Sequence, residues 1–116
     1  MNADRHFDKG ESFERQQAKL DETSDVELIV EGCYFAAHHF ICAGADWHGQ
    51  PHPQTHSQGS NAGLLRRSAA PNEVELAWGA LERLRAGSVY GGKPGSAGEA
   101  RAKLALVKAW VEAARP

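Results

Sequence analysis

An arginine and a tyrosine lie close together in the segment LRAGSVYGG, residues 84–92, where a patterned stretch gives way to glycines. A guanidinium presents a planar fork of N–H donors that suits a phosphate, and a phenol hydroxyl can add a further donor. On an ideal helix, five residues turn Arg85 and Tyr90 about 140° apart, so their side chains diverge. If Gly87 ends or loosens the helix, Tyr90 can fold back beside Arg85. The segment is therefore either an anion-binding site or a helix end anchored by a structural tyrosine.

The position of Arg85 is unusual because it continues an apolar stripe at helical spacing. That stripe is formed by Val74, Ala77, Trp78, Leu81 and Leu84. An arginine there extends its guanidinium to water, pairs with a carboxylate on a neighbouring helix, or binds an anionic ligand. The sequence leaves these three alternatives open.

A second line of polar residues follows the most apolar stretch of the chain. Glu27, Glu31, Tyr34 and His38 are separated by four, three and four residues, which places them on one side of a helix. Polar groups on such a helix must face water or find hydrogen-bond partners. The line is either an exposed strip, an internal hydrogen-bond ladder, or one side of a ligand-binding cleft lined by Tyr34 and His38.

Three histidines spaced by four residues, His48, His52 and His56, raise the question of a metal site. The spacing would align their imidazoles on a helix, but Pro51 and Pro53 exclude a helix there. We therefore predict solvated loop histidines, with no metal site and no cofactor.

The length and charge of the chain restrict the classes of protein to consider. A chain of 116 residues supports one domain, residues 1–116, with a single core. Its net charge of −2 shows no global basic excess of the kind that favours nucleic acid, so any such contact must be local. The beginning of the chain is polar, and we expect no membrane-spanning segment and a cytoplasmic location. As residues of one helix, Cys33 and Cys42 would lie about 13 Å apart along its axis and could not form a disulfide.

Helical periodicity is the only regular pattern, so we predict an all-α fold, an up-and-down bundle of four main helices. A polar residue followed three residues later by glutamate predicts three helix starts, at Ser24, Asn72 and Ser96. The first helix is expected from about Arg5 to Leu20, and the apolar helix after Ser24 should be central. The sequence also predicts a His/Pro/Gln-rich loop at about residues 45–60 and a short extra helical turn near residues 61–67.

The order of several short motifs resembles the HEPN superfamily (higher eukaryotes and prokaryotes nucleotide-binding domain). The motifs are CYFAAHHFICAG, THS, LLRR, LERLRAGSVYGG and GEARAKLALVKAWVEAA, and the similarity covers about residues 10–114. The resemblance implies a small helical bundle that commonly forms a homodimer, often encoded beside a minimal nucleotidyltransferase. It also implies nucleotide or RNA binding, and many members are metal-independent ribonucleases of toxin–antitoxin systems.

The resemblance assigns roles to particular residues. Arg85 occupies the position of the family's catalytic arginine, and Tyr90 stands where its histidine would be; His56 resembles a histidine after the central helix. A phenol with a pKa of about 10 is a poor base at neutral pH, whereas imidazole titrates there. The resemblance therefore favours a nucleotide- or RNA-binding module without efficient cleavage. The alternatives are a ribonuclease in which a histidine such as His56 or His38 acts with Arg85, and a structural dimerisation or interaction protein.

Overall fold

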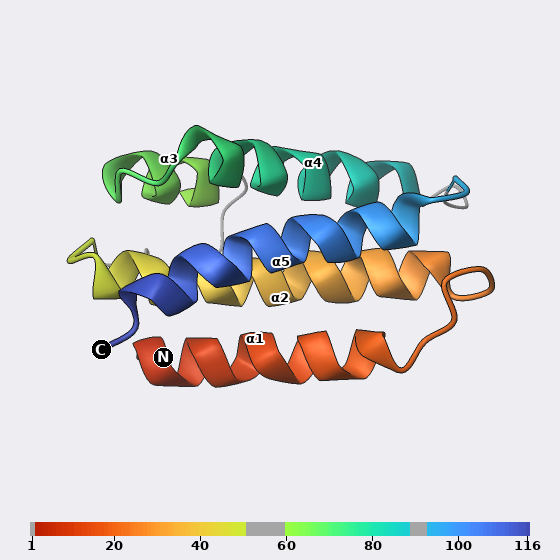
Figure 1. Cartoon of the computed structure of the whole chain (residues 1–116), viewed down its shortest axis with the longest axis horizontal. Coiled ribbons are helices and arrows are strands. Elements are labelled where there is room, and N and C mark those ends of the chain that lie inside the picture. The colour runs from red at the N-terminus through yellow and green to blue at the C-terminus, as the bar shows by residue number, and fades with distance from the viewer. Residues whose placement is uncertain (1, 51–59, 89–92) are drawn as a thin grey trace.

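A computed structural model describes residues 2–50, 60–88 and 93–116 (Figure 1). These residues form α1 (Ala3–Ala18), α2 (Val26–Trp47), α3 (Ser60–Arg67), α4 (Asn72–Ser88) and α5 (Ser96–Ala114). The four long helices run alternately in opposite directions, and no strand occurs in the described ranges. The predicted all-α bundle of four main helices is thus confirmed, and α3 corresponds to the predicted extra turn.

Helix α2 is the centre of the bundle because it is apolar on most sides. It packs against all four other helices, and Ile29, Val30, Phe40 and Ile41 are fully buried. By length and composition alone α2 could cross a membrane, which corrects the expectation that no segment is long enough. However, 61% of its apolar window is buried by the rest of the protein, as in the core helix of a water-soluble bundle.

Two of the three predicted capping boxes are wrong in detail, although the helices begin within two residues of the predicted caps. The N-cap of α2 is Asp25, without a side-chain cap, and Ser24 instead donates its backbone N–H and its hydroxyl to Asp21. The backbone N–H groups of Ser24 and Thr23 hold the pKa of Asp21 below its usual value. At α5 the N-cap is Gly95, whose φ of 87° lies in the left-handed region that favours glycine.

The end of α1 is fastened to α5 by Arg101. Its guanidinium donates to the Gln17 side-chain oxygen at 2.8 Å, the Gln17 carbonyl at 2.7 Å and the Leu20 carbonyl at 3.1 Å. It also pairs with Glu22 at 2.9 Å. These bonds satisfy carbonyl groups at a helix end, where the intrahelical partners run out. We call this set, Arg101 with Gln17, Leu20 and Glu22, the Arg101 clamp.

Both cysteines lie on α2, as predicted, and both are free and buried. Burial raises the pKa of the Cys33 thiol to about 12, and it raises that of Cys42 to about 12 as well. Neither thiol is therefore ionised at neutral pH.

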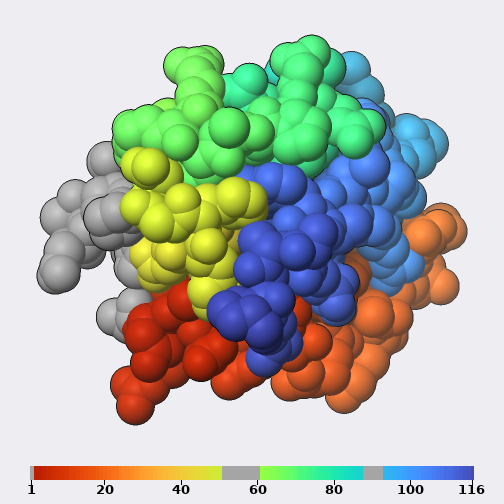
Figure 2. All heavy atoms as spheres, turned by 60° about the vertical axis from the view of Figure 1, so that its left-hand side comes forward, coloured from red at the N-terminus to blue at the C-terminus, as the bar shows by residue number. Residues whose placement is uncertain are grey.

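One end of the bundle brings distant parts of the chain together. Figure 2 shows the beginning of α1, the end of α2 and the end of α5 side by side at that end. The Arg115 guanidinium stacks over the rings of Phe7 and Trp47, at 4.3 and 5.7 Å from their centres. Because α2 continues through Trp47, the first residues of the predicted loop are helical, while residues 51–59 lie outside the described part.

Candidate functional site

Helix α4 carries Arg85 onto the outer side of α2. The Arg85 Nε atom donates to both carboxylate oxygens of Glu31, at 3.2 and 3.3 Å. The guanidinium carbon also lies 4.5 Å from the ring centre of Tyr34 and 5.1 Å from that of Phe35. Two of the alternatives for Arg85 therefore occur together: it pairs with a carboxylate, and its side chain, 34% exposed, reaches solvent.

The helical repeat explains why α2 presents these partners to α4. Glu31, Tyr34 and Phe35 are three and four residues apart, so they occupy adjacent turns on one face. All three are half-buried. Over this turn, the polar line of α2 is a partnered face between helices rather than a fully exposed strip.

Aromatic rings continue this face on both sides of Arg85. Phe13 of α1 stacks on Phe35 with ring centres 5.7 Å apart and planes 29° apart. Tyr34 stacks on Trp78 of α4 with centres 5.0 Å apart. On the α1 side, the Lys9 ammonium lies 5.4 Å from the Phe13 ring centre. A guanidinium or ammonium over a ring face is attracted by its quadrupole, which helps to orient the cation.

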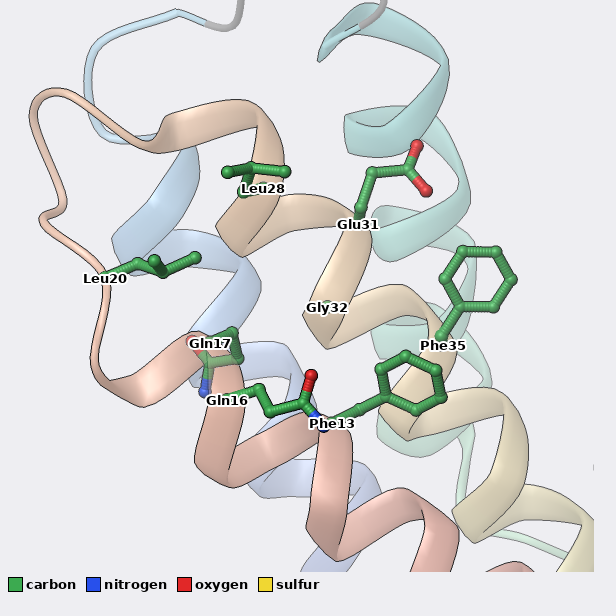
Figure 3. A pocket seen from close by; sticks show the side chains of 8 residues that line it. All are labelled: Phe13, Gln16, Gln17, Leu20, Leu28, Glu31, Gly32 and Phe35. Atoms are coloured by element: carbon green, nitrogen blue, oxygen red, sulfur yellow. The ribbon is translucent and has the colours of Figure 1, made fainter.

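An open groove of about 350 Å³ adjoins these rings, between α1 and the first half of α2. It is lined by Phe13, Gln16, Gln17, Leu20, Leu28, Glu31, Gly32 and Phe35. Figure 3 shows Phe13 and Phe35 at one end, Leu20 and Leu28 at the other, and Gly32 between them. Glu31 and Phe35 line the groove and also contact Arg85, so the groove and the Arg85 position are neighbours.

Gly32 is required by the close approach of α1 and α2 at this groove. A Cβ atom at this position would lie 2.8 Å from the Cβ of Gln17, closer than non-bonded contacts of a Cβ atom normally are. Any larger residue would therefore separate the helices or fill the groove.

His38 lies one helical turn beyond Tyr34, in a different set of contacts. Its Nδ1 accepts from the Asn61 side-chain nitrogen at 2.8 Å, and its Nε2 lies 4.0 Å from the Cys42 sulfur. Asn61 is a buried residue of α3, so this bond ties α3 to α2. The adjacent His39 packs edge-on against His38, and its Nδ1 lies 2.9 Å from Nδ1 of His6.

The structure thus brings two of the five predicted site residues, Arg85 and Tyr34, into contact. His38 lies on α2, as Tyr34 does, but in a different set of contacts. Tyr90 and His56 lie outside the described residues. In the described ranges, no group of three or more His, Cys, Asp or Glu side chains is arranged to hold a metal ion.

Several residues of the site were not singled out from the sequence. Glu31 belongs to the polar line that the sequence predicts, but its spacing does not identify it as the partner of Arg85, and Phe35, Phe13 and Lys9 lie outside the predicted site. A signal was present: Lys9 and Phe13, like Glu31 and Phe35, are spaced by four residues. It does not reveal that α1 and α2 bring the two pairs together.

Comparisons with family models, curated proteins and solved structures find no match to this chain. The HEPN assignment therefore stays a prediction from the order of motifs, and the geometry described above is the basis for the functional argument.

Proposed function

We propose that this chain is a nucleotide- or RNA-binding helical module in which Arg85 contacts phosphate. The observation that carries the proposal is the placement of Arg85. Its guanidinium lies over the rings of Tyr34 and Phe35 and is oriented by Glu31, and its side chain is 34% exposed. Proteins that bind single-stranded nucleic acid combine cations that follow the backbone with aromatic rings for the bases. Arg85 and its neighbours supply both kinds of group in one place.

The Glu31 carboxylate limits how tight such a site can be. It holds the guanidinium in one orientation, so less side-chain entropy is lost when a phosphate binds. It also partly neutralises the charge that attracts the phosphate. We therefore expect modest affinity that falls steeply as salt rises, because phosphate contacts release counterions.

The proposal does not include efficient cleavage. Cleavage needs a general base beside Arg85. His38 is hydrogen-bonded to Asn61 one helical turn beyond Tyr34, and Tyr34 itself carries a phenol, which is a poor base at neutral pH. The ribonuclease alternative depends on Tyr90, on His56 or on a second subunit. Under the HEPN resemblance we further propose a cytoplasmic homodimer, with a nucleotidyltransferase as its partner in a toxin–antitoxin system. A purely structural interaction protein is the remaining alternative.

Binding is tested by fluorescence polarisation with labelled single-stranded RNA and with labelled mononucleotides over a salt series. Arg85→Ala should weaken both by about tenfold, the equivalent of one charge-assisted contact. Arg85→Lys should recover part of the loss, because an ammonium keeps the charge but not the planar fork. The matched control is Arg66→Ala, which removes an equal charge from the exposed Arg66–Glu75 pair on α3 and α4.

Equal effects of Arg85→Ala and Arg66→Ala, with both variants folded by circular dichroism, would contradict the proposal. The cleavage alternative is tested on the same samples by incubating RNA with the wild type and Arg85→Ala. Cleavage that the variant abolishes would establish a ribonuclease instead of a binding module.

A further inference from the structure

The groove beside Arg85 points to a specific form of ligand, an inference that rests on the function proposed above. We infer that single-stranded RNA crosses this face from Arg85 to Lys9, with one base seated in the α1–α2 groove against Phe13 and Phe35. The residues Lys9, Phe13, Phe35 and Arg85 are called the RNA row below.

The order of side chains in the RNA row carries the inference. Lys9 lies 5.4 Å from the Phe13 ring centre, the two phenyl rings are 5.7 Å apart, and Arg85 lies 5.1 Å from the Phe35 ring centre. Each ring of the aromatic pair thus has its own cation, Lys9 over Phe13 and Arg85 over Phe35. The pair joins α1 to α2, and Lys9 and Arg85 belong to the flanking helices α1 and α4. An RNA strand that lies across α1, α2 and α4 would meet a cation, two rings and a second cation in turn.

The groove has the size and lining expected for a nucleobase. Its volume of about 350 Å³ falls in the range of small-molecule sites, which are mostly apolar with a few polar groups. The polar groups at its edge include the exposed Gln16 amide, which can donate or accept hydrogen bonds. Leu28, 61% exposed at its mouth, leaves apolar surface for a ring to cover.

The distance between the cations favours an oligonucleotide over a mononucleotide. Lys9 lies over the Phe13 ring and Arg85 over the Phe35 ring, on different helices, so we expect that a single phosphate held by Arg85 does not also reach Lys9. A chain of several nucleotides places successive phosphates at both. Duplex RNA hides its base faces in the stack, so only unpaired bases can use the Phe13 and Phe35 rings. An apolar protein segment would fill the groove without needing either cation.

The first experiment compares a mononucleotide with single-stranded hexamer RNA in the wild type, Lys9→Gln and Arg85→Ala. Lys9→Gln should weaken the hexamer about threefold to tenfold and leave the mononucleotide unchanged. It should also lower the slope of log affinity against log salt by about 0.7, the value for one phosphate contact on a single strand. Arg85→Ala should weaken both ligands. The matched control, Lys103→Gln on α5, should change neither.

The second experiment examines the base. Phe13→Leu keeps an apolar side chain but removes the ring, and it should weaken the hexamer about tenfold. The same substitution should not affect an abasic hexamer, which offers phosphates and no ring to stack. A variant that merely disturbed the fold would weaken both oligonucleotides, so the abasic ligand separates the two explanations.

The outcomes distinguish this inference from the proposed function. If Arg85→Ala weakens the mononucleotide but Lys9→Gln behaves like Lys103→Gln on the hexamer, the RNA row is wrong and the proposed function stands. If neither ligand binds the wild type, both fail. If Leu28→Glu dissociates a dimer in sedimentation and leaves hexamer binding unchanged, the groove docks a second copy of the chain, which overturns the inference.

Discussion

Arg101 and Arg85 each join helices in this bundle, and they do so in different ways. Arg101 of the Arg101 clamp donates to two backbone carbonyls, a side-chain amide and a carboxylate at the end of α1. Arg85 bonds through Nε to the Glu31 carboxylate and lies over the rings of Tyr34 and Phe35. Both side chains are partly exposed, Arg101 by 25% and Arg85 by 34%, so exposure alone does not separate them.

The difference lies in what each guanidinium contacts. Backbone carbonyls at a helix end need donors for the protein to fold well, so an arginine that supplies them acts on stability. Aromatic rings do not need a cation in the same sense, and an arginine held over them is oriented toward whatever approaches the surface. The comparison predicts that Arg101 matters mainly for folding and Arg85 mainly for binding.

The largest expected effect is that of Arg101→Ala. The substitution leaves two carbonyls and the Gln17 amide without these donors, and it should lower the free energy of unfolding by about 2–4 kcal/mol. Arg101→Lys should recover only part, because three N–H groups on one nitrogen cannot span the same acceptors. Urea denaturation followed by circular dichroism measures both. A loss no larger than that from Arg85→Ala would remove the distinction between the two arginines.

Gly32 connects the two regions, because it abuts Gln17 of the Arg101 clamp and also lines the groove. Gly32→Ala should destabilise the protein by about 1–3 kcal/mol, since the new Cβ forces α1 away from α2. The control is Gly98→Ala on α5, where a Cβ meets nothing within 4 Å. Alanine there should be neutral or stabilising by up to about 1 kcal/mol, because it is a better helix former. The melting temperature should therefore fall for Gly32→Ala and stay the same or rise for Gly98→Ala.

Arg85→Ala should have a smaller effect on stability, about 1 kcal/mol or less. Both side chains of the Arg85–Glu31 pair are accessible to solvent, and such ion pairs contribute little to the free energy of unfolding. Its effect on RNA binding should be the larger one. A double variant, Arg85→Ala with Glu31→Ala, measures how much of the stability loss comes from leaving the carboxylate without Arg85. A loss above about 3 kcal/mol for Arg85→Ala alone would place Arg85 in the same structural class as Arg101.

The smallest effect near neutral pH comes from the buried thiols. Burial raises the pKa of Cys33 and Cys42 to about 12 in the folded protein from an ordinary value of 9.0. The unfolded chain therefore loses these protons first, so the contribution of the two thiols to stability should be constant below pH 9 and fall as pH rises from 9 toward 12. Cys33→Ala and Cys42→Ala should each make this fall shallower. A fall of the same steepness in both variants would assign it to other groups, among them Lys108, whose ion pairs with Glu14 and Glu11 also weaken at high pH.

The sequence was sufficient for the helices and insufficient for most contacts between them. The apolar stripes after Ser24, Asn72 and Ser96 predicted α2, α4 and α5, because burial of one face follows directly from the helical repeat. The caps were less predictable, since Asp25 and Gly95, in place of Ser24 and Ser96, are the N-caps of α2 and α5, and neither makes a side-chain cap bond. Small local alternatives of similar energy decide which residue caps a helix.

The candidate site shows the same division. Arg85 stood out because a charge continued an apolar stripe, and a carboxylate partner was one of the predicted alternatives. Its identity as Glu31, 54 residues away in sequence, depends on how α4 packs on α2. The groove depends on Gly32 and on the approach of α1, which no spacing within a single helix encodes.

The position of α2 has a consequence for how the molecule opens. Because each of the other four helices packs on it, the buried part of α2 cannot become exposed without detaching a neighbour. Its amide hydrogens should therefore exchange with deuterium only when the whole bundle unfolds, whereas those of the short peripheral helix α3 can exchange through local fraying. The bundle would thus unfold as one cooperative unit around α2, while the side chains on its outer surface can be substituted one at a time.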